Sequence, residues 1–206
     1  MTKKALIFDL DDTIYPIKPF ADEMFATLFD LLKSQLSDEV YQQVKEDVLT
    51  TPFHRVADRY KFNKELKEEG MKLSLKMTYN GPIKAFEDYQ IAKDLAIEKF
   101  LVTAGYTDFQ KSKIKLLGIK KDFKEIFIPD PAKSDLSKKD VFLQILQKYH
   151  FLPGEVLVIG DNPEAEIVDA RELGIETYLY DYQGKYSPAL ANYYGSNYAN
   201  LPEILN

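Results

Sequence analysis

Residues 7–13 read Ile7-Phe8-Asp9-Leu10-Asp11-Asp12-Thr13, and they end a short apolar run that starts at Ala5. Such an uninterrupted run is typical of a strand that is buried on both faces of a parallel sheet. Asp9 and Asp11 stand at alternate positions as the chain leaves this strand, so their carboxylates can reach one small volume. Two carboxylates in one volume need a cation or a shared proton. The alternative is an acidic turn that only caps a helix at Thr13.

Four more apolar segments predict strands, and polar or turn residues follow each of them. These strands are residues 99–102, 125–128, 155–159 and 177–180. Three other segments have apolar residues at three- and four-residue spacing, which predicts helices. These helices are residues 109–117, 138–149 and 164–173. Strands that alternate with helices form a parallel sheet, so we expect a doubly wound α/β fold that binds its ligands at the carboxyl ends of the strands.

The segment from residue 16 to residue 90 does not follow this alternation. It is predicted to form successive amphipathic helices, and a turn at Tyr79-Asn80-Gly81-Pro82 then leads the chain back to the core. The predicted helices are residues 18–35, 38–49, 53–61 and 64–79. We expect a small helical domain, residues 16–90, inserted into a core that residues 1–15 and 91–206 form together.

The composition restricts the chemistry and the partners of the chain. It has no cysteine, which excludes disulfides, thiolate catalysis and cysteine-based metal sites. The net charge is −6 and no long basic run is present, so nucleic acid is not an expected partner. The N-terminal residues lack the apolar region of a signal peptide, and no apolar run approaches the roughly 20 residues that cross a bilayer. We therefore expect a cytoplasmic protein with no membrane partner.

Two acids follow the strand predicted at residues 155–159. Asp161 comes just after it, and Glu166 lies five residues farther along. Both could face a metal ion beside Asp9, because Mg²⁺ prefers oxygen ligands from one or two carboxylates together with water and phosphate. The alternative is that the acids here are ordinary residues of a helix N-terminus, which fits Glu164 best.

Thr103, Ala104 and Gly105 follow the strand predicted at residues 99–102. The Thr103 hydroxyl and the backbone N–H groups at a helix start are a suitable cradle for a phosphate oxygen. A threonine in this position is also a common helix cap, which is the alternative interpretation.

The segment Ser137-Lys138-Lys139-Asp140 is typical of a capping box, which would place a lysine on the first turn of a helix. A site with several carboxylates and a phosphate needs a fixed cation where negative charge develops. Lys138 is the first candidate, and Lys139 and Lys133 are the second choices. Most lysines are solvated surface charges, and this alternative stays open for all three.

In this order and at these strand ends, the four segments resemble the four sequence motifs of the haloacid dehalogenase-like (HAD) superfamily. Residues 7–13 resemble its DxDxT nucleophile motif and residues 100–103 its second motif. Lys138 matches the third motif, and Gly160-Asp161 with Glu166 matches the fourth. The resemblance continues through residues 170–175 to residues 198–205. The chain departs from the common pattern by having Glu166 where the family often has aspartate, and by lacking the Lys-Pro-x-Pro spelling around the lysine.

This resemblance implies a Rossmann-like HAD core and a magnesium-dependent phosphatase that acts on phosphate monoesters. Asp9 would attack phosphorus to form an aspartyl-phosphate, and Asp11 would protonate the leaving oxygen and later activate water. Lys138 would stabilise the transferring phosphoryl group. The implied phosphate-binding residues are Leu10, Thr13, Thr103, Ala104, Gly105 and Lys138. The implied Mg²⁺ ligands are Asp9, Asp161 and the backbone carbonyl of Asp11, with Glu166 holding a metal-bound water.

The helical insert resembles the C1 cap that closes over the site in this superfamily and selects the leaving group. The candidates for its inner surface are Phe20, Phe53, His54, Arg55 and Tyr60. Most of these aromatic residues could instead form the core of the cap itself, and His150 is expected to be a solvated surface residue.

Other functions share these motifs. A dehalogenase attacks carbon and does not need the acid at Asp11, so the presence of this residue favours phosphoryl chemistry. A phosphomutase, in which a second substrate hydroxyl replaces water, fits the same motifs, and a non-catalytic phosphate-binding protein is the alternative from another class. The expected partner is a small phosphorylated metabolite, but the motifs specify neither that metabolite nor the oligomeric state.

Overall fold

Six parallel strands form one sheet in the computed structural model, which describes residues 2–205. Their order across the sheet is β3-β2-β1-β4-β5-β6. The strands are β1 Ala5–Phe8, β2 Glu98–Val102, β3 Glu125–Phe127, β4 Val156–Gly160, β5 Glu176–Tyr180 and β6 Tyr193–Gly195. Phe8 at the end of β1 is in register with Leu101 of β2 and Ile159 of β4. The segments that follow these three strands therefore leave the sheet together at one edge.

The prediction of a doubly wound parallel α/β sheet is confirmed. The five predicted strands differ from β1 to β5 by no more than one residue at either end. The sequence does not predict β6, which has only three residues and pairs with β5 at the edge of the sheet. A half-buried segment this short has neither an alternating pattern nor an apolar run that could identify it.

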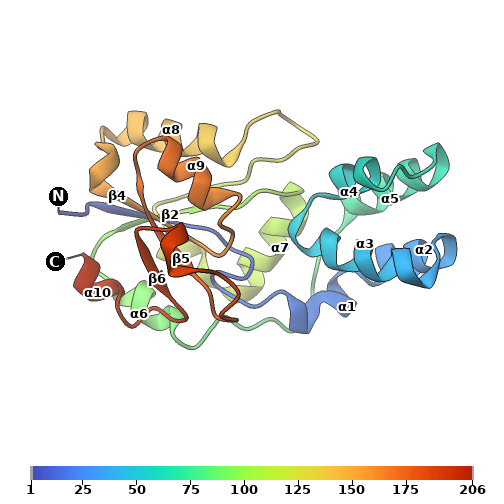
Figure 1. Ribbon diagram of the computed structural model, residues 1–206, viewed down its shortest axis with the longest axis horizontal. Coiled ribbons are helices and arrows are strands. Elements are labelled where there is room, and N and C mark those ends of the chain that lie inside the picture. Colours follow the sequence, from blue (N-terminus) through green and yellow to red (C-terminus); the bar gives the residue numbers. More distant parts are fainter. Residues whose placement is uncertain (1, 206) are drawn as a thin grey trace.

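Helices cover both faces of the sheet (Figure 1). Helices α8 (Lys138–Tyr149) and α9 (Glu166–Glu172) pack with Ile7 on one face. Helices α6 (Tyr89–Asp94), α7 (Thr107–Leu117) and α10 (Leu201–Ile204) pack with Phe8 on the other. Neighbouring side chains of β1 thus enter two different apolar layers, as the uninterrupted apolar run requires.

Helix α8 has the predicted bounds, whereas α9 begins two residues later than predicted. The reason is a local turn in which the Asn162 side chain accepts a hydrogen bond from the backbone N–H of Glu164, over 2.9 Å. This side-chain bond competes with helix formation, so the helix starts only at Glu166.

The helices between residues 18 and 76 lie beside the sheet, at one end of the molecule (Figure 1). They are α1 Ala21–Met24, α2 Ala26–Gln35, α3 Asp38–Thr50, α4 Phe53–Arg59 and α5 Lys64–Lys76, preceded by a 3₁₀ turn at Lys18–Phe20. The predicted helix at residues 18–35 is interrupted at Phe25, where φ is −107° and ψ is 11°. The Phe25 ring stacks on Phe29 and makes an edge contact with Phe109 of α7, at 5.3 Å between ring centroids.

This contact is part of an apolar core that these helices share with the sheet. Buried residues of the core run from Phe8 through Phe25 to Leu28 of α2, Val44 of α3 and Leu66 of α5. None of the helices described is long and apolar enough to span a membrane.

Candidate active site

Asp9 is the first residue after β1, and it lines a pocket at the carboxyl edge of the sheet. Its backbone N–H donates to the carbonyl of Ile159 over 2.9 Å, which fixes the direction in which the chain leaves the strand. Nζ of Lys138 donates to Oδ1 of Asp9 over 2.7 Å. Burial raises the pKa of Asp9 to about 7, although the Lys138 ammonium acts in the opposite direction.

Asp161 and Glu166 form an acidic group with Asp9. One carboxylate oxygen from each of the three lies within 4.8 Å of the other two. Asp161 follows β4 and accepts a hydrogen bond from the Thr13 hydroxyl, over 3.3 Å. Burial raises the pKa of Asp161 well above its ordinary value, and the nearby Glu166 adds to this effect. Three oxygen donors at this spacing suit Mg²⁺, whose charge also offsets the repulsion among them.

Glu166 is held in this group by its own loop. Its Oε1 accepts the backbone N–H of Asn162 over 2.7 Å, and its Oε2 accepts from Lys138 over 2.9 Å. The side chain passes directly over Gly160, where an added Cβ would lie 2.3 Å from Cγ of the glutamate. Glycine at position 160 therefore allows a glutamate on the first turn of α9 to reach the acidic group.

Lys138 is the first residue of α8, at a capping box of the predicted kind. The backbone N–H of Ser137 donates to Asp140 over 2.9 Å, and that of Asp140 donates to the Ser137 hydroxyl over 3.2 Å. Burial favours the neutral amine of Lys138, but the carboxylates of Asp9 and Glu166 outweigh it and raise the pKa of this lysine. The capped helix start thus directs a fixed cation between two acidic side chains.

The other basic residues considered from the sequence lie in different surroundings. Lys139 pairs with Glu172 on the outer side of α8 and α9, and Lys133 pairs with Asp130 over 2.9 Å. His150 is exposed and ends α8 in a left-handed conformation.

Asp11 lines the same pocket, but its carboxylate is bound by α7. Nζ of Lys113 lies 2.6 and 2.8 Å from its two oxygens, and Nε2 of Gln110 donates to Oδ2 over 3.1 Å. The Tyr15 hydroxyl donates to Oδ1. Burial opposes ionisation of Asp11, but the Lys113 ammonium outweighs it and lowers the pKa of this carboxyl. The Asp11 carboxylate is therefore held ionised by α7, and within residues 2–205 it is not part of the acidic group of Asp9.

The sequence motifs do not identify Gln110, Lys113 or Tyr15. A signal is nevertheless present, because Gln110 and Lys113 share the buried face of α7 with Phe109 and Ile114. Polar groups on a buried helix face need partners, so such positions point to a nearby acidic or polar site.

Thr103, Ala104 and Gly105 line the pocket after β2. The Thr103 hydroxyl is hydrogen-bonded to the Gln110 amide, so this threonine is connected to α7. The N–H of Gly105, expected to bind phosphate, donates instead to the carbonyl of Pro129 over 3.0 Å. The loop after β3 runs close to this turn, and its Pro129 carbonyl accepts the Gly105 N–H. The Thr103 hydroxyl and the Ala104 N–H are the remaining phosphate donors expected here.

Leu10 and Thr13 complete the set of expected phosphate-binding residues. Both are fully buried, and the Leu10 carbonyl accepts the backbone N–H of Ile14 over 2.9 Å. The Thr13 hydroxyl is directed at Asp161, so its observed contact is with the acidic group.

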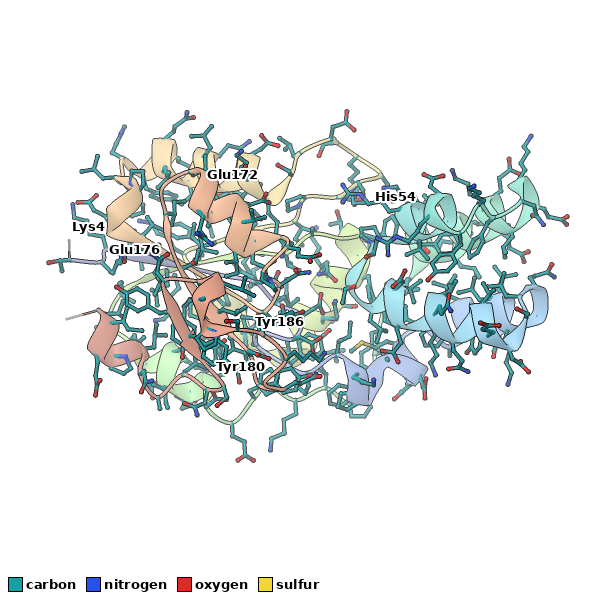
Figure 2. All side chains as sticks on the ribbon, in the orientation of Figure 1. Lys4, His54, Glu172, Glu176, Tyr180 and Tyr186 are labelled. Carbon is teal, nitrogen blue, oxygen red and sulfur yellow. The ribbon has the colours of Figure 1, made fainter. Side chains whose placement is uncertain are left out.

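The pocket has a volume of about 400 Å³ and is lined by both the sheet edge and residues of helices α2 to α5. Phe53, His54 and Arg55 line it, but Phe53 is buried and also packs against Phe62 inside the insert. Figure 2 shows His54 at the end of α4 that is nearer to the sheet. Phe20 and Tyr60 pack instead against aromatic neighbours.

Comparisons with known proteins point to one family. The family model for haloacid dehalogenase-like hydrolases matches residues 3–174. A glyceraldehyde 3-phosphate phosphatase from Methanopyrus kandleri is 24% identical over 199 residues, which cover 84% of this chain and 82% of that protein.

Solved structures share the whole fold. The HAD-like family protein SP0104 from Streptococcus pneumoniae has a TM-score of 0.74 and 17% identity, with 99% of each chain covered. A HAD phosphatase from Thermococcus onnurineus has a TM-score of 0.70 and 20% identity, with 98% of each chain covered. The HAD-hydrolase candidate YfnB from Bacillus subtilis, solved with bound magnesium, has a TM-score of 0.70 and 19% identity over 100% of both chains. At these identities the likeness establishes the fold.

Proposed function

Because the chain belongs to the haloacid dehalogenase-like hydrolase family, we propose that it is a magnesium-dependent phosphatase that hydrolyses small phosphate monoesters. The observation that carries this proposal is the contrast between two carboxylates in one pocket. Asp9 lies beside Asp161, Glu166 and the ammonium of Lys138, whereas Asp11 is bound by α7. Two acids whose surroundings differ in this way are suited to different roles, one as nucleophile and one as acid and base.

In the proposed reaction, Asp9 attacks phosphorus and becomes an aspartyl-phosphate. Lys138 lies 2.7 Å from Asp9, so its charge is close enough to stabilise the phosphoryl oxygens. Asp11 donates a proton to the leaving oxygen and then removes one from the attacking water. The incoming phosphate brings negative charge to the pocket, which favours the protonated form of Asp11 that the first step needs.

The residues proposed to hold magnesium are Asp9, Asp161 and the backbone carbonyl of Asp11, with Glu166 reaching it through a water molecule. When bound, the ion supplies positive charge that offsets the negative charge of the phosphoryl group and the acids. The donor set supports this part of the proposal, because it consists of oxygen atoms alone.

The substrate class is a small phosphorylated metabolite. Support comes from the relative named as a glyceraldehyde 3-phosphate phosphatase, which aligns with most of this chain. The acid at Asp11 also favours phosphoryl transfer over attack on carbon. In this proposal, residues 16–90 act as a cap over a core of residues 1–15 and 91–206, and Phe53, His54 and Arg55 contact the leaving group. The common pocket of about 400 Å³ is what supports the cap assignment.

The proposal can be tested with purified protein and an aryl phosphate. We expect turnover that requires Mg²⁺ and is abolished in Asp9→Asn, since an amide is a poor nucleophile and a weak metal ligand. Asp135→Asn is a matched control, because Asp135 also lines the pocket but is exposed. After an acid quench, mass spectrometry should detect a phosphoryl group on Asp9. Turnover by Asp9→Asn at the wild-type rate would remove Asp9 from this role.

A further inference from the structure

Lys113 is a buried charged residue to which the proposed mechanism gives no role. Its side chain is 1% exposed, whereas that of its partner Asp11 is 24% exposed. Lysine is almost never buried to this extent without a partner. Both residues line the pocket, but the ammonium is almost closed to solvent whereas the carboxylate is partly exposed, so Asp11 is the group of this pair that a bound substrate can contact.

In the described part of the chain, both hydrogen bonds of the Lys113 ammonium are to Asp11. It donates to both oxygens of Asp11, over 2.6 and 2.8 Å, and holds the carboxylate against α7. The Tyr15 hydroxyl donates to Oδ1 and the Gln110 amide to Oδ2, so the three donors together restrain the plane of the carboxylate. The other sides of the ammonium face aromatic rings, with Nζ 4.5 Å from the centroid of Phe109 and 5.8 Å from that of Tyr15. Among residues 2–205, Asp11 is the one acid within salt-bridge distance of this lysine.

Gln110 connects this pair to the turn after β2. It lies three residues before Lys113 on the same face of α7, and its amide donates to Asp11 over 3.1 Å and to the Thr103 hydroxyl. Gly105 lies against this amide: its φ is +149°, which residues with a side chain rarely adopt, and an added Cβ would lie 3.3 Å from Cδ of Gln110. One face of α7 therefore binds both the expected phosphate donor Thr103 and the expected acid Asp11.

We propose that Lys113 is a positioning residue that orients the Asp11 carboxylate for proton transfer, and that Gln110 links this orientation to the phosphate-binding turn. This inference rests on the proposed phosphatase function. In the first step a bond forms between Asp9 and phosphorus, the bond to the leaving oxygen breaks, and that oxygen takes the proton of Asp11. In the second step water gives a proton to Asp11, its oxygen bonds to phosphorus, and the bond to Asp9 breaks.

The test compares two substrates under single-turnover conditions, an aryl phosphate with a good leaving group and an alkyl phosphate with a poor one. Lys113→Met should lose at least about tenfold more rate on the alkyl phosphate, because only that leaving group needs a well-oriented acid. Lys115→Met, which changes an exposed lysine of the same helix, should leave both rates near the wild-type values. Equal losses on both substrates in Lys113→Met would overturn the proposal, since a purely structural role predicts them.

A second comparison removes the two charges together and remains informative if Lys113→Met does not fold. In an Asp11→Asn background, Lys113→Met should cause no further loss of rate on either substrate, because its effect acts through Asp11. A further loss in the double variant would overturn the proposal. Absence of turnover by the wild-type protein would instead overturn the proposed function, and this inference with it.

Discussion

Nζ of Lys138 and Oδ1 of Asp9 are 2.7 Å apart, although 129 residues separate them in the chain. The capping box at Ser137 fixes the start of α8, and the register of β1 with β4 fixes the exit of Asp9 from the sheet. Secondary structure therefore positions both Lys138 and Asp9. Little rearrangement of the two side chains is needed when negative charge develops on a phosphoryl group.

Replacement of Lys138 by alanine should lower kcat on an aryl phosphate on the order of a hundredfold or more, because the fixed cation is lost. Lys139→Ala and Lys133→Ala should stay near wild type, since these lysines pair with Glu172 and Asp130. Steady-state assays of the three variants at saturating Mg²⁺ provide the measurement. A small and equal effect in all three would mean that Lys138 is an ordinary surface charge, and loss of activity in another variant alone would assign the motif lysine to that position.

Glu166→Gln should weaken Mg²⁺ binding by about tenfold or more, as is typical when a group that orients the metal site is altered. Glutamine can still accept the N–H of Asn162, so the loop should keep its conformation while the acidic group loses one charge. Isothermal titration calorimetry with Mg²⁺ measures the change. Glu164→Gln is the matched control, because Glu164 is exposed on the same loop. Unchanged affinity in Glu166→Gln would show that this residue has no part in the metal site.

The strands of the core were predictable because burial on both faces produces continuous apolar runs that end in polar residues. The break at Phe25 was not, since the apolar spacing of residues 18–35 continues across it. The contact that accompanies the break is with Phe109 on α7, far along the chain. Strand β6 and helix α6 are similarly short and depend on tertiary contacts, such as the hydrogen bond of 3.2 Å from Tyr89 to Asp122.

Some residues of the candidate site could likewise be predicted from the sequence, and others could not. The proximity of Asp9, Asp161 and Lys138 could be predicted because each stands at the start of a loop or helix with a recognisable local pattern. The proximity of Lys113 to Asp11 could not, because this lysine has the composition of a surface residue and its partner lies 102 residues away. Burial of a lysine can be predicted from a sequence only when the helix face that carries it is known to be apolar.

Asp11→Asn should reduce the rate of the phosphorylation step far more for an alkyl phosphate than for an aryl phosphate, because only the poor leaving group needs a proton. General acid catalysis contributes on the order of a hundredfold or more, which sets the expected difference between the substrates. Rapid-quench measurement of product release in the first turnover tests this. If both substrates lost the same factor, Asp11 would serve the fold or the metal, and its contacts with Lys113 and Gln110 would be structural.

The raised pKa of Asp9 makes a prediction that does not depend on activity. Burial raises this pKa from 3.8 to about 7, so the folded, metal-free protein favours the neutral acid. The stability that this group contributes is fully present below the pKa of the unfolded chain and is lost as the pH rises through about 7. Asparagine resembles the neutral acid in shape and does not titrate. The Asp9→Asn variant should therefore not lose this stability as the pH rises.

The Tm of metal-free Asp9→Asn, relative to that of the wild type, should therefore increase between about pH 5 and pH 8.5. For a chain of this length one kcal/mol corresponds to about 2–4 °C, and we expect the relative Tm to rise by about 3 °C or more. Saturating Mg²⁺ should reduce the difference at the higher pH, because the ion binds the ionised carboxylate of the folded wild type. Thermal unfolding followed by circular dichroism in a chelator provides the measurement. A difference in Tm that stays constant over this pH range would show that Asp9 keeps an ordinary pKa.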